Sequence, residues 1–293
     1  MAKKLFGAPF EQSKKIQGGY KKYVKNAYKK MGIVNVIVTS LLAIVFFGIF
    51  FYALGVGMLE GMISAKTDEI NILNYHNTIL AASFAAPFTV VSKFVIFLWI
   101  FIWVTLIVRR LLPRWTVVSF CTIGWELGVV MSLLQFFTLG PILFGYALVG
   151  VGWIGIILQI FFLIIFGIRQ IKNELVEIYR KLYNQSEEKN SETEKRYFNR
   201  NLIFLILSVM VINMFTFRFG CISQYFELWS LVYSWLFLLL GLFTIYIVKV
   251  LVIRNGISIY YFRKYKELYK ETWNLTDKQW YGKRRAKNLL KRN

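Results

Sequence analysis

One stretch limits the possible folds of this chain more than any other: residues 116–168, in which two long apolar runs meet at Gly140 and Pro141. Each run exceeds the roughly 20 residues that a helix needs to cross ~30 Å of hydrocarbon. We therefore predict a transmembrane helical hairpin with its turn at Gly140-Pro141.

The rest of the chain extends this pattern. Apolar residues make up 57% of the 293 residues and aromatic residues 18%, and the mean hydropathy is +0.52, which is typical of a membrane protein. The predicted spans lie near residues 33–59, 87–108, 116–138, 141–168, 201–219 and 227–252. We predict an all-α, polytopic integral membrane protein with three parts: a basic amphipathic lead over residues 1–31, a six-helix transmembrane domain over 32–254, and a basic, aromatic helical tail over 255–293.

The distribution of charge predicts the orientation. Lysine and arginine are in excess in residues 1–30, 109–115, 169–200 and 255–293, and scarce in the alternate segments such as 60–86. Cytoplasmic loops carry the excess of these residues. Both termini are therefore predicted to be cytoplasmic, which agrees with an even number of spans, and the plasma membrane is the expected location.

The two terminal segments have the pattern of interfacial helices. In residues 14–31 the apolar side chains share one helical face, and the tail has tyrosine and tryptophan at four-residue spacing after residue 260. Such helices bind anionic lipid, which attracts each nearby lysine by about 1 kcal/mol. The predicted lipid-surface residues are Lys21, Lys22, Lys25, Lys29, Lys283, Arg284 and Arg285. Aromatic rows beside basic residues can also stack on nucleic acid, but that partner is not expected for a segment that follows a span directly.

Two polar residues in the hairpin are the main functional candidates. Glu126 is the only acidic residue deep inside an apolar run, about 12 residues or ~18 Å past Arg114. Gln159 lies about 10 residues or ~15 Å before Arg169 on the returning helix. With the turn at Gly140-Pro141, the two side chains are expected at similar depth. A carboxylate at mid-bilayer costs several kcal/mol unless it is paired or protonated, and it marks a functional site by default.

Helical spacing adds companions to both residues. Ser119 and Thr122 share a stripe with Glu126, whereas Gly145, Gly152 and Gly155 share a stripe with Gln159. A glycine stripe lets another backbone approach closely, so both polar groups are expected to face protein and not lipid. Lys93, in the second predicted span, can either extend outward to the membrane surface or reach down toward Glu126.

The motifs for catalysis are absent from the sequence. There is no G-x-S-x-G, H-E-x-x-H or Walker A loop and only one histidine. We expect neither an enzyme nor a cofactor or metal site. The sequence favours a subunit of a transport or translocation assembly with its polar core around Glu126. This subunit would dock other membrane or cytoplasmic subunits through its cytoplasmic helices. The alternative is a non-transporting membrane scaffold or assembly factor that uses the same helices to bind partners.

Overall fold

A computed structural model describes residues 5–27, 29–66, 75–111, 115–183, 191–216, 228–282 and 286. Throughout these ranges the regular structure is helical, and no strand occurs in them. The prediction of an all-α fold is confirmed for this part of the chain.

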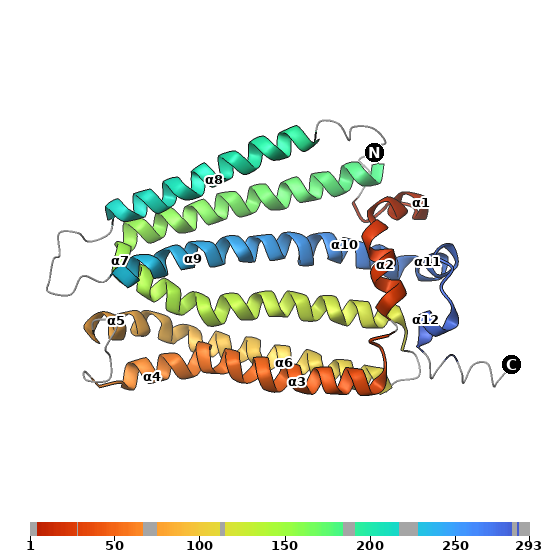
Figure 1. Cartoon of the computed structure of the whole chain (residues 1–293), viewed down its shortest axis with the longest axis horizontal. Coiled ribbons are helices and arrows are strands. Elements are labelled where there is room, and N and C mark those ends of the chain that lie inside the picture. The colour runs from red at the N-terminus through yellow and green to blue at the C-terminus, as the bar shows by residue number, and fades with distance from the viewer. Residues whose placement is uncertain are drawn as a thin grey trace.

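Long helices lie side by side in a bundle (Figure 1). The N-terminal half contributes α3 (Ile33–Tyr52), the π-helical η2 (Ala53–Gly57), α4 (Met58–Ser64), α5 (Tyr75–Ala85), the 3₁₀ turn η3 (Ala86–Phe88) and α6 (Thr89–Leu111). The C-terminal half contributes α7 (Val117–Tyr183), α8 (Ser191–Thr216), α9 (Leu228–Ile247), the π-helical η4 (Val248–Asn255) and α10 (Gly256–Lys264). Helix α7 organises the bundle because it contacts α5, α6, α8, α9 and η4.

Four helical stretches are long and apolar enough to cross a membrane: Ile33–Ser64, Tyr75–Leu111, Val117–Tyr183 and Trp229–Lys264. A shorter apolar stretch, Ile203–Phe215, lies in α8. Large apolar side chains cover the outside of the bundle, for example Ile154 at 77% and Phe215 at 83% exposure. A surface of this extent is typical of a protein surrounded by lipid.

The turn of the hairpin lies at Gly152 and not at Gly140-Pro141. Pro141 is buried inside α7, and the helix continues through it. At Gly152 the backbone has φ 69° and ψ −176°, and the chain reverses there (Figure 1). At ~1.5 Å per residue the first limb of α7, residues 117–151, is ~52 Å long, and the second limb, residues 153–183, is ~46 Å long. The hairpin was predicted correctly, but its turn was placed wrongly.

The two ends of the chain meet at one end of the bundle (Figure 1). The N-terminal side supplies α1 (Phe10–Ser13), the 3₁₀ turn η1 (Lys14–Ile16) and α2 (Gly18–Ala27). The C-terminal side supplies α10, α11 (Lys266–Thr272) and α12 (Asp277–Tyr281). We call residues 5–27 together with residues 256–282 the terminal cap.

Candidate functional site

The position of the turn separates the two polar candidates in depth. Glu126 lies ~39 Å before Gly152 along the first limb of α7, whereas Gln159 lies only ~10 Å after Gly152 along the second limb, at ~1.5 Å per residue. The hydrocarbon core is ~30 Å thick. Gln159 is therefore close to the turn and Glu126 close to the terminal cap, so the prediction that they lie at similar depth is wrong.

Glu126 is half-buried in the first limb of α7. Its neighbour Trp125 donates a hydrogen bond from Nε1 to the carbonyl oxygen of Leu251 at 2.7 Å. Trp125 also limits the space at Gly256, where a Cβ atom would lie 3.2 Å from the indole ring. Among the described residues no hydrogen bond or ion pair reaches the Glu126 carboxylate. The contact between α7 and η4 is thus made by Trp125, the residue next to Glu126.

Lys93 does not approach Glu126. Its Nζ lies 3.4 Å from a carboxylate oxygen of Glu60 in α4, and both side chains are exposed. The adjacent Ser92 donates a hydrogen bond to the carbonyl oxygen of Phe137, which is ~16 Å along α7 from Glu126. A lysine stem cannot span that distance, so of the two alternatives for Lys93 the structure has the one directed away from Glu126.

The two hydroxyl residues predicted to accompany Glu126 have local partners. Thr122 is buried and donates to the carbonyl oxygen of Val118 at 2.9 Å. The hydroxyl of Ser119 lies 3.4 Å from that of Thr116 near the start of α7, in a groove that also includes Arg263. These contacts are local to the first turns of α7, and they do not form a polar core around Glu126.

Gln159 belongs to a polar cluster that joins three helices. Its Nε2 donates to the hydroxyl of Ser234 at 2.6 Å, and Nδ2 of Asn213 lies 3.4 Å from the same hydroxyl. All three side chains are fully buried, and they come from α7, α9 and α8. The Gln159 Oε1 atom has no hydrogen-bond partner among the described residues. The sequence analysis identified Gln159 but not its partners, because it gave no information on how α8 and α9 pack.

The predicted packing glycines have three different environments. A Cβ atom at Gly145 would overlap the backbone carbonyl of Ala81, so Gly145 allows α5 to lie against α7. Gly155 is buried in the second limb. Gly152 meets nothing within 4 Å, since it forms the turn, and its prediction as a packing residue is wrong. Gly150, which was not predicted, takes a packing role instead, because its Cβ would lie 2.7 Å from Ser230.

A buried charge cluster that was not predicted from the sequence lies toward the C-terminal end of the second limb of α7. The Glu174 carboxylate is 1% exposed and accepts two hydrogen bonds from Arg254, Nε to Oε1 at 2.7 Å and Nη2 to Oε2 at 3.1 Å. Lys249 lies 3.6 Å from the same carboxylate and donates to Gln170 at 3.2 Å. Because Lys249 and Arg254 both belong to η4, this cluster fixes the π-helix to α7. A signal was present: Glu174 follows Ile171 by three residues and therefore lies on the buried stripe.

An aromatic core joins the terminal cap to the end of the bundle. The apolar residues of α2 and the start of α7 pack against those of the C-terminal helices, and the buried members are Val24, Ala27, Met31, Val36, Leu106, Trp115, Val117, Val118, Cys121, Ile123, Phe262, Tyr269, Trp273, Leu275 and Trp280. Burial raises the pKa of Tyr20, which packs against this core, and it raises that of Tyr269 to about 12, although the Ser13 hydrogen bond acts in the opposite direction.

Hydrogen bonds join the two segments of the cap directly. The hydroxyls of Ser13 and Tyr269 lie 2.5 Å apart, and Gln17 Nε2 donates to the carbonyl oxygen of Ser258 at 2.6 Å. Tyr265 donates to the carbonyl oxygen of Ala8 at 2.8 Å. Helix α2 and the aromatic row were expected to lay their apolar faces on lipid. The structure shows these faces buried against each other and against α7, so that expectation is corrected.

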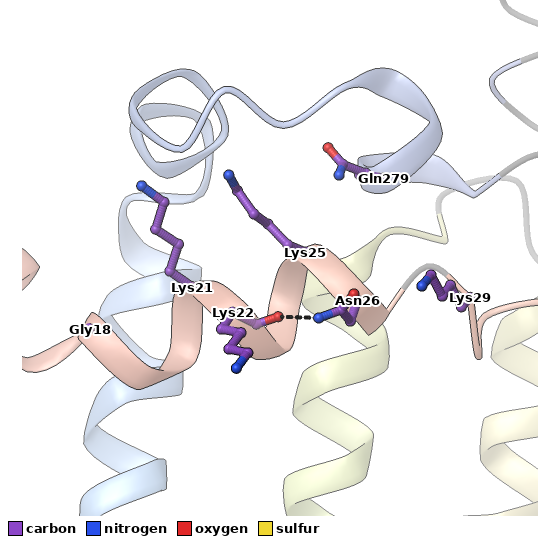
Figure 2. A pocket seen from close by; sticks show the side chains of 7 residues that line it. All are labelled: Gly18, Lys21, Lys22, Lys25, Asn26, Lys29 and Gln279. Carbon is purple, nitrogen blue, oxygen red and sulfur yellow. Dashed lines mark hydrogen bonds between the residues drawn. The ribbon is translucent and has the colours of Figure 1, made fainter.

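Three predicted lipid-surface lysines of α2, together with Lys29 beyond its end, line one shallow groove (Figure 2). Its volume is about 480 Å³, and it is lined by Gly18, Lys21, Lys22, Lys25, Asn26, Lys29 and Gln279. Lys283, Arg284 and Arg285 lie outside the described residues.

Comparison with known proteins gives no family for this chain. No protein-family model, no curated protein and no solved structure matches it. Among the described residues, no three His, Cys, Asp or Glu side chains are grouped so that they could hold a metal ion. The function is therefore inferred from the geometry of the bundle and of the terminal cap.

Proposed function

We propose that the protein is an integral membrane subunit that crosses the bilayer six times and presents the terminal cap in the cytoplasm as a docking platform for other proteins. The observation that supports this proposal most is that the apolar faces of the two terminal segments are buried, against each other and against the ends of α3, α6 and α7. A segment that only anchors a chain to lipid would keep its apolar face for the membrane. The cap instead packs on the end of the bundle and presents exposed lysine and arginine side chains.

The course of the bundle supports six spans. Each limb of α7 is longer than the roughly 20 residues that a span needs. The paths α3 to α4, α5 to α6 and α9 to α10 are also long enough, whereas the apolar stretch Ile203–Phe215 of α8 is shorter and is proposed as the remaining span (Figure 1). The excess of lysine and arginine at the cap end favours a cytoplasmic cap, and the proposed location is the plasma membrane.

Cysteine labelling tests this topology. In a chain whose two native cysteines are replaced, the exposed positions Ser64 and Thr272 lie at opposite ends of the bundle. We expect an impermeant thiol reagent added outside intact cells to label Ser64→Cys only, and Thr272→Cys to react only after the membrane is opened. Labelling of both positions from the same side would refute six spans with a cytoplasmic cap.

The surface of the cap favours an acidic partner. Arg263, Lys264 and Lys266 are exposed on the C-terminal side, and Lys15 and Lys21 on the N-terminal side. Complementary charge mainly increases the rate and specificity of association. We therefore propose that the docked subunits present acidic surfaces to the cap.

Site-specific photo-crosslinking in native membranes tests the docking function. A photoreactive amino acid at Lys15 or Lys266 should give discrete protein adducts. The yield of these adducts should fall in the charge-reversal variant Arg263→Glu. The same group at Ile154 or Phe215, which are lipid-facing in this account, provides the control. Adducts that are the same at all four positions, or none from the cap, would refute the docking function.

Transport is the second candidate, and the Gln159 cluster favours it. This cluster places a buried amide oxygen without a hydrogen-bond partner among the described residues in an otherwise apolar part of the bundle. Polar side chains inside a membrane mark ion or substrate paths by default. If the protein transports protons or alkali cations, reconstituted vesicles should show flux above protein-free vesicles, and Gln159→Leu and Glu126→Gln should reduce it without loss of folding. Equal flux with and without the protein would exclude transport of these ions.

A further inference from the structure

The groove beside α2 concentrates positive charge on one side of the terminal cap. Four lysines, Lys21, Lys22, Lys25 and Lys29, line it, and no acidic residue does. Figure 2 shows Lys21 and Lys25 extending from α2 on the side of the C-terminal segment that carries Gln279. The groove is therefore built from both ends of the chain.

Several lysines elsewhere in the described structure are paired with a carboxylate, although not all of them are. Outside the groove, Lys14, Lys93, Lys181, Lys249, Lys266 and Lys270 each form an ion pair. Among the described residues, no carboxylate pairs with any of the four groove lysines. Like charges four residues apart on a helix, as at Lys21 and Lys25 in α2, destabilise it by about 0.2–0.5 kcal/mol per pair. An anion in the groove would remove this repulsion.

Gln279 adds a neutral hydrogen-bond donor to the positively charged groove. Its Oε1 accepts hydrogen bonds from the backbone N–H of Thr276 at 3.0 Å and from the hydroxyl of Thr276 at 3.2 Å, in the capping box of α12. These bonds fix the side chain and use its oxygen. The Nε2 group, which has two N–H donors, makes no hydrogen bond within the described residues and belongs to a side chain that lines the groove.

We propose that this groove binds a phosphate-bearing anion. Ammonium groups bind phosphate as point charges, and hydrogen bonds between charged groups are roughly twice as strong as neutral ones. The volume of about 480 Å³ accommodates more than one phosphoryl group. The bound phosphate can belong to a soluble polyphosphate anion or to a lipid headgroup. Such binding does not require the docking function proposed above, since it uses only the groove itself.

Binding of inorganic tripolyphosphate to the full-length protein in uncharged detergent provides the first test. We expect calorimetry to detect saturable binding, and the double variant Lys21→Ala/Lys25→Ala to weaken it by at least about tenfold, the equivalent of one lost charged hydrogen bond. The matched control is Lys15→Ala/Lys172→Ala, which removes the same net charge from exposed positions outside the groove. Equal weakening by both double variants would overturn the site, because it would show attraction by net charge alone.

The substitution Gln279→Glu should keep the fold and repel an anionic ligand. Glutamate at this position of a capping box accepts the same hydrogen bonds, so α12 should retain its stability. The added negative charge faces the groove and should weaken tripolyphosphate binding by at least about tenfold. Unchanged affinity in a folded Gln279→Glu protein would overturn the proposal.

Nanodiscs distinguish the two sources of phosphate. If the ligand is a lipid headgroup, phosphatidylglycerol discs should raise the melting temperature of the wild type relative to phosphatidylcholine discs, and Lys21→Ala/Lys25→Ala should remove the difference while the control variant keeps it. If the ligand is soluble, tripolyphosphate should raise the melting temperature equally in both kinds of disc. Absence of both effects, together with absence of binding in detergent, would refute the site.

Discussion

Loss of the ion-pair partner should cost more for the Glu174 carboxylate than for Arg254, because Glu174 is the buried member of the pair. Glu174 is 1% exposed, whereas the Arg254 side chain is 47% exposed and can be hydrated if its partner is lost. We therefore expect Arg254→Met to lower the free energy of unfolding by about 3 kcal/mol, since it leaves a buried charge with only the more distant Lys249. Denaturant unfolding of the protein in detergent measures this loss.

A double-mutant cycle separates the pair from its surroundings. Glu174→Met together with Arg254→Met should cost less than Arg254→Met alone, because no buried charge is then left unpaired. Lys181→Met is the matched control, because it breaks the ion pair between Lys181 and Glu177, two side chains that are both partly exposed. This substitution should lower the free energy of unfolding by no more than about 1 kcal/mol. Strict additivity of the two substitutions would show that Glu174 and Arg254 do not interact.

The sequence identified the right kinds of residue but assigned some of them the wrong depth. Glu126 and Gln159 were expected at similar depth because their positions were counted from Arg114 and Arg169, with the turn assigned to Gly140-Pro141. A proline can lie within a transmembrane helix when neighbouring groups satisfy the freed backbone, so Pro141 alone did not decide the turn. Glu174 was missed because residues 169–200 were assigned as a whole to a basic cytoplasmic segment, although its helical spacing placed it on the buried stripe.

At the scale of the element, three glycines of α7 should respond differently to the same substitution. Gly152→Ala should cost about 1–3 kcal/mol because its φ and ψ lie in a region essentially restricted to glycine. Gly145→Ala should cost about 1–3 kcal/mol for another reason, since its Cβ overlaps the backbone of Ala81. Gly140→Ala meets nothing within 4 Å and is the control, with no loss expected. Thermal unfolding in detergent measures all three; a loss at Gly140 as large as the others would contradict this assignment.

The terminal cap should lose stability at alkaline pH. Burial raises the pKa of Tyr269 from 10.0 to about 12, so the neutral phenol is favoured in the folded cap. This contribution is complete below pH 10.0. It is lost as the pH rises toward 12, because the unfolded chain ionises first. Tryptophan fluorescence of the cap should therefore report a steeper decline in stability for the wild type than for Tyr269→Phe over this range.

Tyr269→Phe carries a cost of its own that must be subtracted. It removes the hydrogen bond with Ser13, worth about 1 kcal/mol at neutral pH. Ser13→Ala removes the same hydrogen bond but keeps the titrating phenol, and it should retain the steep alkaline decline. Identical pH profiles for wild type and Tyr269→Phe would show that this residue does not control the transition.

The helices were easier to predict from the sequence than the surfaces against which they pack. Apolar runs of sufficient length specified the helices of the bundle, and residues 14–31, where the sequence has an apolar stripe, include the helix α2. The stripe could not indicate what covers that face. Lipid and a second protein segment are both apolar, and the contact between Gln17 and Ser258 joins residues that are far apart in the sequence. Pairings of this kind have no local signal.

At the scale of the whole molecule, the protein combines an apolar bundle with a terminal cap that packs against one end of it. Apolar side chains cover the bundle, and the terminal cap carries both chain ends and the groove of four lysines. Composition and charge distribution predicted a membrane protein with basic ends. They did not predict that the two ends would fold together, because that depends on the return of the last helix to the side of the bundle where the chain begins.

The most direct test of the account is hydrogen exchange of the full-length protein in phosphatidylcholine nanodiscs, which contain no anionic lipid. We predict that the amides of α2 and α11 are protected there, and that Trp280→Ala in the buried core of the cap reduces the protection of both helices while the limbs of α7 remain protected. Protection of α2 or α11 only in nanodiscs that contain anionic lipid would contradict the account, because the two segments would then be independent surface helices.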